Sequence, residues 1–199
     1  MDSAVRKIYN DMRLRIMRGD FSANSFFVEN GIAEEYGVSR GTAREAMLLL
    51  CESKFLIKHP RKGYFLYQLS EKEESDAAYA RYCLEMGGIR KVIDSCSDEQ
   101  IRSLYDVLNG AEINYLPEDM DNYRFHMALA YLSGNGSIPE LISGLLEFTS
   151  RSAVNVQSSE SNISHQHIIE ALLSRDYEKV AMLMAIDLRV SEQAGFAGK

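Results

Sequence analysis

The 199-residue chain has few cysteines: Cys51, Cys83 and Cys96, with no C-x-x-C pair among them. Three scattered thiols argue against a disulfide-stapled fold and against a cysteine-based zinc site, and they fit a reducing cytoplasm, the compartment we expect. Prolines number only 3, and the 13 glycines form no repeat. This composition excludes collagen-like chains and proline-rich disordered chains.

Long apolar runs are also missing. No uninterrupted stretch reaches the roughly 18 residues that a membrane-spanning helix needs, so we expect no membrane partner. Residues 1–7 lead into an amphipathic segment and do not form an apolar signal core. With 46% hydrophobic and 26% charged residues, the composition is typical of a globular protein of one or two domains.

The net charge of −7 is unevenly distributed along the chain. Residues 1–68 contain 11 Lys or Arg against 8 Asp or Glu, whereas residues 69–199 contain 11 against 21. A basic N-terminal part and an acidic C-terminal part indicate two units with different tasks. We therefore predict a first domain over 1–68, a short polar linker over 69–75 and a second domain over 76–199.

Hydrophobic spacing in the first domain predicts three helices followed by a hairpin. The helices are expected over 3–18, 28–36 and 39–52, with a tight turn at Gly37 and Ser39 as the cap of the third helix. Two short strands are expected over 55–59 and 64–67, joined by a turn that contains Pro60 and Gly63. This order predicts a winged helix-turn-helix.

The second domain is expected to be entirely helical. Its predicted helices cover residues 73–94, 97–114, 119–133, 137–158, 160–174 and 176–193. About six helices of this length can bury a core as an antiparallel bundle. The predicted fold class is therefore mainly α, with an N-terminal winged helix-turn-helix and a C-terminal helical bundle.

Arg40 and Arg44 stand at i and i+4 at the start of the third helix, so they share one face. A guanidinium there can donate two hydrogen bonds to guanine in the major groove. Further candidate DNA contacts come from the helix start and the hairpin turn: Ser39, Thr42, Arg61, Lys62 and Gly63. The alternative is a solvated helix with surface arginines. Because the basic charge is modest, DNA binding would need two copies of the domain, which implies a homodimer.

Residues 5–67 resemble the DNA-binding domain of the GntR superfamily of bacterial transcription regulators. The matching residues are Ile16-Met17-Arg18-Gly19-Asp20-Phe21, Glu29, Ile32-Ala33-Glu34-Glu35-Tyr36-Gly37-Val38-Ser39-Arg40, Arg44-Glu45-Ala46, Leu49, Leu50 and Arg61-Lys62-Gly63-Tyr64. The resemblance implies base contacts by Arg40 and Arg44, and backbone or groove contacts by Ser39, Thr42 and the hairpin.

Three positions depart from that family's pattern and leave the operator sequence open. Asn24-Ser25 replaces a Pro-Gly pair, Gly41 stands where a hydroxyl residue is common, and Asn30 stands where some members have a DNA-contacting arginine.

Four polar residues of the second domain form a candidate metal site. Asn122 and His126 are i and i+4 on one predicted helix, while His165 and Asp187 fall on the apolar faces of two others. Two imidazoles, a carboxylate and an amide oxygen could surround one metal ion. The alternative is a set of hydrogen-bonded polar residues around a water-filled or ligand-filled cavity. His167, two residues from His165, is expected at the surface.

Residues 75–193 resemble the FCD effector domain of FadR-type GntR regulators. The matching residues are Arg81-Tyr82-Cys83-Leu84-Glu85, Phe125-His126, Ser133-Gly134-Asn135, His165, Ile168-Ile169-Glu170-Ala171-Leu172 and Arg175-Asp176. Members of that family often hold a metal with one Asp and three His. On this chain the Asp position is Asn122 and the third His position is Asp187, which implies a rearranged site for Zn, Ni or Mn.

The same resemblance implies a small organic acid as effector, beside the metal. Arg81 and Arg151 are candidates to bind its carboxylate, and surface salt bridges are the alternative for them. The sequence thus predicts a ligand-responsive transcription regulator, expected to be a repressor, and not an enzyme. Two alternatives remain: a metal-dependent hydrolase built on His126, His165 and Asp187, and a helical protein-interaction module.

Overall fold

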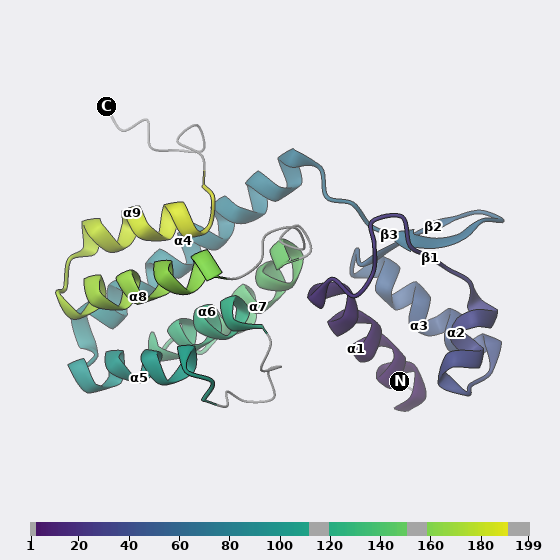
Figure 1. Cartoon of the computed structure of the whole chain (residues 1–199), viewed down its shortest axis with the longest axis horizontal. Coiled ribbons are helices and arrows are strands. Elements are labelled where there is room, and N and C mark those ends of the chain that lie inside the picture. Colours follow the sequence, from purple (N-terminus) through teal and green to yellow (C-terminus); the bar gives the residue numbers. More distant parts are fainter. Residues whose placement is uncertain (1–2, 112–119, 151–158, 191–199) are drawn as a thin grey trace. The chain divides into compact units, whose positions relative to one another are not determined.

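The computed structural model describes residues 3–111, 120–150 and 159–190, and Figure 1 shows its helices and strands. The chain forms two compact units, Met1–Leu69 and Ser70–Lys199. Each unit has its own buried core. No helix in the described part of the chain combines the length and apolar character that crossing a lipid bilayer takes.

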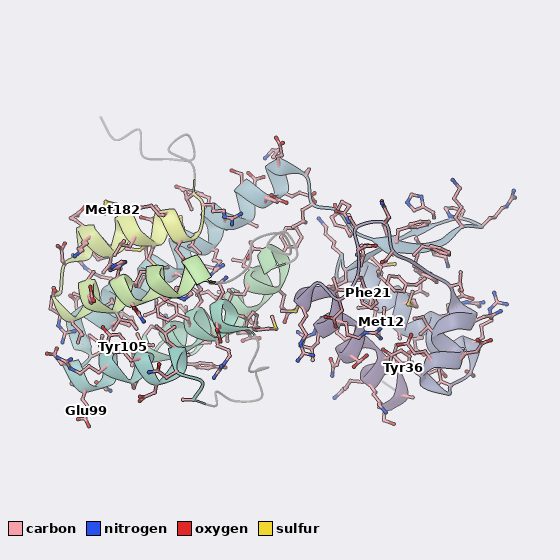
Figure 2. All side chains as sticks on the ribbon, in the orientation of Figure 1. Met12, Phe21, Tyr36, Glu99, Tyr105 and Met182 are labelled. Carbon is pink, nitrogen blue, oxygen red and sulfur yellow. The ribbon has the colours of Figure 1, made fainter. Side chains whose placement is uncertain are left out.

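Three helices form the body of the N-terminal unit: α1 (Ser3–Arg18), α2 (Glu29–Tyr36) and α3 (Arg40–Glu52). Each begins and ends within one residue of its predicted range. α1 and α3 bury apolar side chains that recur every three or four residues, which is the pattern that predicted them. Figure 2 shows Met12 of α1 in this unit, where it is completely buried.

The turn between α2 and α3 has the predicted chemistry. Gly37 ends α2 in the left-handed region, with φ of 63°, which favours glycine. Ser39 caps α3, because its hydroxyl oxygen accepts a hydrogen bond of 3.1 Å from the backbone N–H of Thr42. This turn places the first residue of α3, Arg40, at the surface.

The wing is a three-stranded antiparallel sheet in the order β1-β3-β2. β2 (Leu56–His59) and β3 (Gly63–Leu66) form the predicted hairpin, while β1 (Phe26–Phe27) was not predicted. Two residues are too short to show strand periodicity, and only pairing with β3 makes them a strand. Gly63 is required here, because its φ is 114° and a Cβ would lie 2.6 Å from the carbonyl oxygen of Phe27.

The described part of the C-terminal unit contains six helices, and the predicted mainly α class is confirmed. They are α4 (Glu71–Ser95), α5 (Asp98–Leu108), α6 (Asp121–Leu132), α7 (Ser137–Ser150), α8 (Ser159–Leu173) and α9 (Tyr177–Asp187). α4 packs against α6, α7 and α9, and α5 packs against α6 and α8. The core between them is mostly aliphatic and includes Ile89, Ile101, Phe125, Ile168 and Val180.

Several helix ends differ from the predicted ranges. α4 begins at Glu71, two residues before the predicted start, because Ser70 and Glu73 form a reciprocal capping box. Most of the predicted linker 69–75 is therefore the first turn of a helix. α5 ends at Leu108 and not at 114, and Gly110 follows it with φ of 92°. α9 ends at Asp187, six residues before the predicted end.

The two methionines near the end of α9 lie on different faces. Met184 is completely buried in the core, whereas Met182 is 57% exposed and is labelled at the surface in Figure 2. Two residues that are two positions apart, such as Met182 and Met184, point to different faces of a helix.

Candidate functional site

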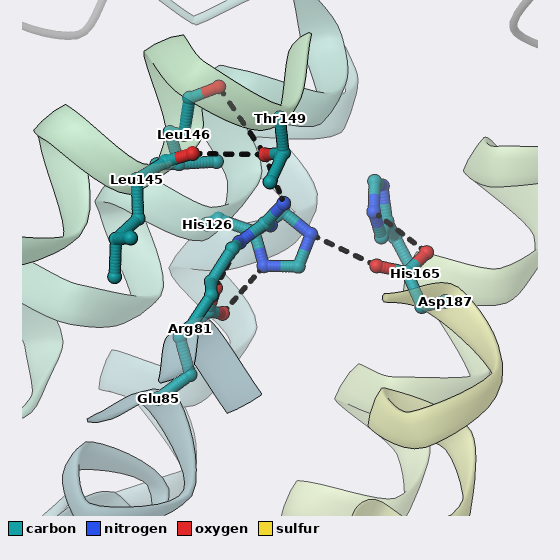
Figure 3. A network of polar contacts seen from close by, with 8 residues as sticks. All are labelled: Arg81, Glu85, His126, Leu145, Leu146, Thr149, His165 and Asp187. Carbon is teal, nitrogen blue, oxygen red and sulfur yellow. Dashed lines mark hydrogen bonds and ion pairs between the residues drawn. The ribbon is translucent and has the colours of Figure 1, made fainter. Parts of the chain in front are cut away.

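A cluster of charged side chains lies inside the C-terminal bundle, where helices α4, α6, α8 and α9 supply one or two members each. Figure 3 shows Arg81 and Glu85 from α4, His126 from α6, His165 from α8, and Asp187 from the end of α9. None of these five side chains exposes more than 5% of its surface. Buried charges are stable only when they are paired, so the contacts within the cluster determine its chemistry.

His126 lies between two carboxylates (Figure 3). Its Nδ1 is 2.6 Å from Oε2 of Glu85, and its Nε2 is 2.9 Å from Oδ2 of Asp187. Burial and the charge of Arg81 oppose protonation of the ring, but the two carboxylates outweigh them and raise the pKa of His126. His126 therefore holds a proton more tightly than an ordinary histidine does.

His165 has the opposite electrostatic balance. Burial lowers its pKa, so the ring is neutral. The ring stacks on Phe125 with centroids 4.1 Å apart. Its Nε2 is 3.4 Å from Oδ1 of Asp187, but neither ring nitrogen makes a hydrogen bond with any part of the chain that the structure describes. A neutral, buried imidazole with unused nitrogens is suited to bind a metal ion.

Asp187 and Arg81 complete the cluster. Burial opposes ionisation of Asp187, but the hydrogen bond from His126 and the nearby ring of His165 hold its pKa well below the ordinary range. Arg81 donates from Nε to Oε1 of Glu85 at 2.5 Å and from Nη1 to Oγ1 of Thr149 at 3.5 Å. Nη2 of Arg81 is buried and has no hydrogen-bond partner among the residues that the structure describes.

The donor set fits a divalent cation. His126, His165 and Asp187 can each present one ligand atom, and these atoms lie within 4.8 Å of one another. Two imidazole nitrogens and one carboxylate oxygen are ligands that zinc, nickel and manganese accept. The orphaned nitrogens of His165 are the observation that most directly favours an ion over a purely structural network.

The structure brings together three of the four predicted metal ligands. Asn122 lies one helical turn before His126 on α6 and is half-buried, and its role as a ligand stays a prediction. Arg151, the second candidate for effector binding, lies outside the described residues. His167 is exposed, as its position two residues from His165 predicted.

Sequence reasoning assigned no role to Glu85, although this carboxylate holds both Arg81 and His126. One signal was present, because Arg81 and Glu85 are i and i+4 and opposite charges at that spacing form ion pairs on a helix. The contact with His126 spans 41 positions and leaves no mark in the local sequence.

A second candidate site is the start of α3 in the N-terminal unit. The side chains of Arg40 and Arg44 are 63% and 48% exposed. Both contact a single carboxylate on α2, that of Glu29. Nε of Arg40 is 2.8 Å from Oε2, while Nε and Nη2 of Arg44 each lie 2.9 Å from one of the two oxygens. Both arginine side chains are therefore exposed to solvent and are also held by the carboxylate of Glu29.

Glu29 was also missed as a functional residue, because it has the opposite sign to a DNA-binding group. Its side chain is only 12% exposed, and it accepts a further hydrogen bond of 3.2 Å from the hydroxyl of Tyr64 on β3. The hydrogen bonds from Arg44 outweigh burial and, with that from Arg40, lower the pKa of Glu29 to about 2. Glu29 is therefore ionised at neutral pH.

The remaining predicted DNA contacts lie at the surface of the same unit. Arg61 and Lys62 are exposed in the hairpin turn, next to Gly63. The hydroxyls of Ser39 and Thr42 are 2.9 Å apart, so part of their hydrogen-bonding capacity is used by the cap. Their contacts with DNA stay predictions.

Comparisons with known proteins assign both units to described families. Residues 4–66 match the family "Bacterial regulatory proteins, gntR family", and residues 76–189 match the FCD domain. An HTH-type transcriptional regulator of Bacillus subtilis (strain 168), YdhC, is 30% identical over 142 residues, which are 68% of this chain and 63% of the relative. The gluconate operon transcriptional repressor of the same organism is 28% identical over 127 residues, 64% of this chain and 51% of the relative. The matches thus span less than two thirds of either relative.

Solved structures show the same fold. A GntR regulator from Rhodococcus sp. RHA1 has a TM-score of 0.76 and 21% identity, with complete coverage of both chains. McbR/YncC of E. coli has a TM-score of 0.70 and 18% identity, and 95% of each chain is covered.

Proposed function

This chain belongs to the gntR family of bacterial regulatory proteins and carries an FCD domain, and on that premise we propose that it is a cytoplasmic, ligand-responsive transcriptional regulator that acts as a repressor. The observation that carries the proposal is the pair of exposed guanidinium groups, Arg40 and Arg44, one turn apart at the start of α3. The names of its relatives, which include an operon repressor, support the same conclusion.

The N-terminal unit is proposed to bind duplex DNA. The start of α3 enters the major groove, where Arg40 and Arg44 can each donate a bidentate pair of hydrogen bonds to O6 and N7 of guanine. Arg61 and Lys62 of the wing supply contacts to the phosphate backbone. Because one unit offers few basic groups, two copies would bind two half-sites about 34–36 Å apart as a homodimer.

The C-terminal unit is proposed to sense a small carboxylate. Nη2 of Arg81 is a buried donor without a partner in the described residues, and the charge of Arg81 acts on His126 within the cluster that holds the candidate metal ligands. Guanidinium groups bind carboxylates strongly when both are shielded from water. A divalent cation held by His126, His165 and Asp187 would supply a Lewis-acidic position for a carboxylate oxygen.

Effector and operator binding are proposed to be coupled through two arrangements of the helical bundle. An effector that binds one arrangement more tightly shifts the population towards it, and this shift changes the spacing of the two DNA-binding units. Coupling of this kind typically changes operator affinity by about 5–150-fold. Substituting Arg81 with Gln should abolish the effect of the acid on operator affinity. Because Arg81 also pairs with the buried Glu85, a thermal unfolding curve of the variant is the control that its bundle is folded.

The test of DNA binding is a selection of sequences from a random duplex library with the full chain. We expect a motif of two half-sites, with an affinity that falls steeply as salt rises. Arg40→Ala and Arg44→Ala should each lower operator affinity by about 5- to 150-fold, which corresponds to roughly 1–3 kcal/mol. Arg90→Ala on α4 removes an exposed arginine and serves as the matched control. Absence of any enriched motif would contradict the proposal.

The hydrolase alternative gains no support from the relatives, whose names are those of transcriptional regulators. Its proposed centre is also closed to solvent, because the side chains of His126, His165 and Asp187 are at most 5% exposed. The bundle would have to open to admit an effector as well as a substrate, so this closure does not separate the two functions.

A further inference from the structure

One carboxylate, that of Glu29, contacts both proposed DNA-reading arginines. It receives hydrogen bonds from Nε of Arg40 and from Nε and Nη2 of Arg44, at 2.8 to 2.9 Å. An arginine that reads DNA needs hydrogen-bond donors that no neighbouring carboxylate occupies. Base contacts by Arg40 and Arg44 are therefore possible only if some N–H groups of each guanidinium are not bound to Glu29.

The contacts with Glu29 occupy only one edge of each arginine. A guanidinium has a side edge, formed by Nε and one Nη, and an end edge, formed by both Nη atoms. Arg44 presents its side edge to Glu29, and Arg40 uses Nε alone. The end edge of each group remains for a bidentate contact with O6 and N7 of guanine. Glu29 and a base can therefore bind the same guanidinium at once.

Glu29 is itself held in place by two elements of the winged domain, α2 and β3. It lies in the first turn of α2, where the helix dipole favours a carboxylate, and its side chain is only 12% exposed. The hydroxyl of Tyr64 donates to it from β3, and the Tyr64 side chain is buried. A rigidly held anion restricts the rotamers of two long, exposed side chains that would otherwise lose that freedom on binding DNA.

We infer that Glu29 is a positioning residue for base readout, which holds Arg40 and Arg44 with their end edges directed at the groove. This inference rests on the proposed DNA-binding function. Glu29 also places a negative charge beside the two arginines, which weakens their attraction to phosphates at any sequence. Both effects increase the difference between operator and non-operator affinity, and that difference is specificity.

The test compares sequence selection and affinity for the unsubstituted chain, Glu29→Gln and the matched control Glu34→Gln. Glu34 is an exposed residue of the same helix, and its substitution changes the charge equally. For Glu29→Gln we expect weaker enrichment of the guanines in each half-site. The ratio of operator to non-operator affinity should fall about tenfold or more, while non-operator affinity stays constant or rises. Glu34→Gln should retain the wild-type motif and ratio.

A second variant, Glu29→Asp, separates geometry from charge. It retains the negative charge but is one methylene shorter, so it cannot reach both arginines from the same backbone position. The same fall in the ratio, with unchanged non-operator affinity, is expected. If a thermal unfolding curve shows that Glu29→Gln does not fold, Glu29→Asp serves as the test in its place.

The results that would overturn the inference are specific. If both variants keep the wild-type ratio within twofold, Glu29 has no positioning role. If Glu29→Gln binds the operator more tightly with unchanged sequence preference, Glu29 competes with DNA and does not assist it. Failure of the wild type to select any motif would refute the proposed function itself, which is a different result.

Discussion

Oε2 of Glu85 lies 2.6 Å from Nδ1 of His126, and neither side chain exposes more than 2% of its surface. This contact joins α4 to α6 inside the bundle, and it continues through Arg81 on one side and Asp187 on the other. Positive and negative groups alternate along this series, so each buried charge has a partner of opposite sign. The proposed sensing site is therefore part of the structure that holds α4, α6 and α9 together.

Removing the carboxylate of Glu85 should strongly destabilise the bundle. Glu85→Ala leaves Arg81 and His126 buried without their shared partner, and losing one member of a buried ion pair costs about 3–5 kcal/mol. The measurement is urea unfolding followed by circular dichroism. Glu170→Ala removes an exposed glutamate on α8 and should change stability by no more than about 0.5 kcal/mol. Equal effects of the two substitutions would show that the buried network does not stabilise the fold.

Two histidines on α8 provide a matched test of metal binding. His165 is completely buried near Asp187, whereas His167 is exposed. Zn, Ni or Mn should raise the unfolding temperature of the wild type and of His167→Ala, but not of His165→Ala. Differential scanning fluorimetry after treatment with a chelator measures this shift. The proposed metal site is refuted if none of the three ions changes the unfolding temperature of the wild type and the purified protein holds less than about a tenth of an equivalent of metal.

Metal affinity should rise with pH. The carboxylates of Glu85 and Asp187 raise the pKa of His126, so this ring keeps its proton to a higher pH than usual. A cation must displace that proton before it can bind a ring nitrogen. Isothermal titration calorimetry at pH 6 and pH 8, in buffers with different ionisation enthalpies, should show tighter binding at pH 8 and proton release. An affinity independent of pH would indicate that His126 is not a ligand.

The ion pairs of Glu29 should make the N-terminal unit sensitive to acid. Because Arg44 and Arg40 lower the pKa of Glu29 from 4.5 to about 2, its ionised form stabilises the folded state. This contribution is complete above pH 4.5 and is lost as the pH falls towards 2. The stability difference between wild type and Glu29→Gln in urea unfolding should therefore shrink over that interval. A constant difference across it would mean that the pairs do not stabilise the fold.

Local sequence patterns were sufficient for most of the architecture. The spacing of Val5, Ile8 and Met12 predicted α1 because a helix repeats its buried face every 3.6 residues. Ser39 and Gly37 predicted the turn before α3 because their preferences are set by neighbouring backbone groups. Such signals are contained within about four residues, and so they are visible in the chain before it folds.

Helical spacing suggested His126, His165 and Asp187, with Asn122, as metal ligands, and the resemblance to a known family supported that choice. The structure brings His126, His165 and Asp187 together. Spacing placed His165 and Asp187 on apolar helix faces and His126 one turn from Asn122, but it could not show that the three residues meet, because they belong to three helices. The strand β1 was missed for a similar reason, since its two residues acquire strand geometry only by pairing with Phe65 and Tyr64.

Helices, turns and the uneven distribution of charge follow from the order of the amino acids, because each depends on interactions between near neighbours in the chain. The partners of Glu29 and Glu85 follow only from the folded structure. Glu29 meets Tyr64 across 35 positions, and Glu85 meets His126 across 41. Contacts over such separations form only when helix and sheet packing closes the intervening chain, and packing depends on the whole set of buried side chains.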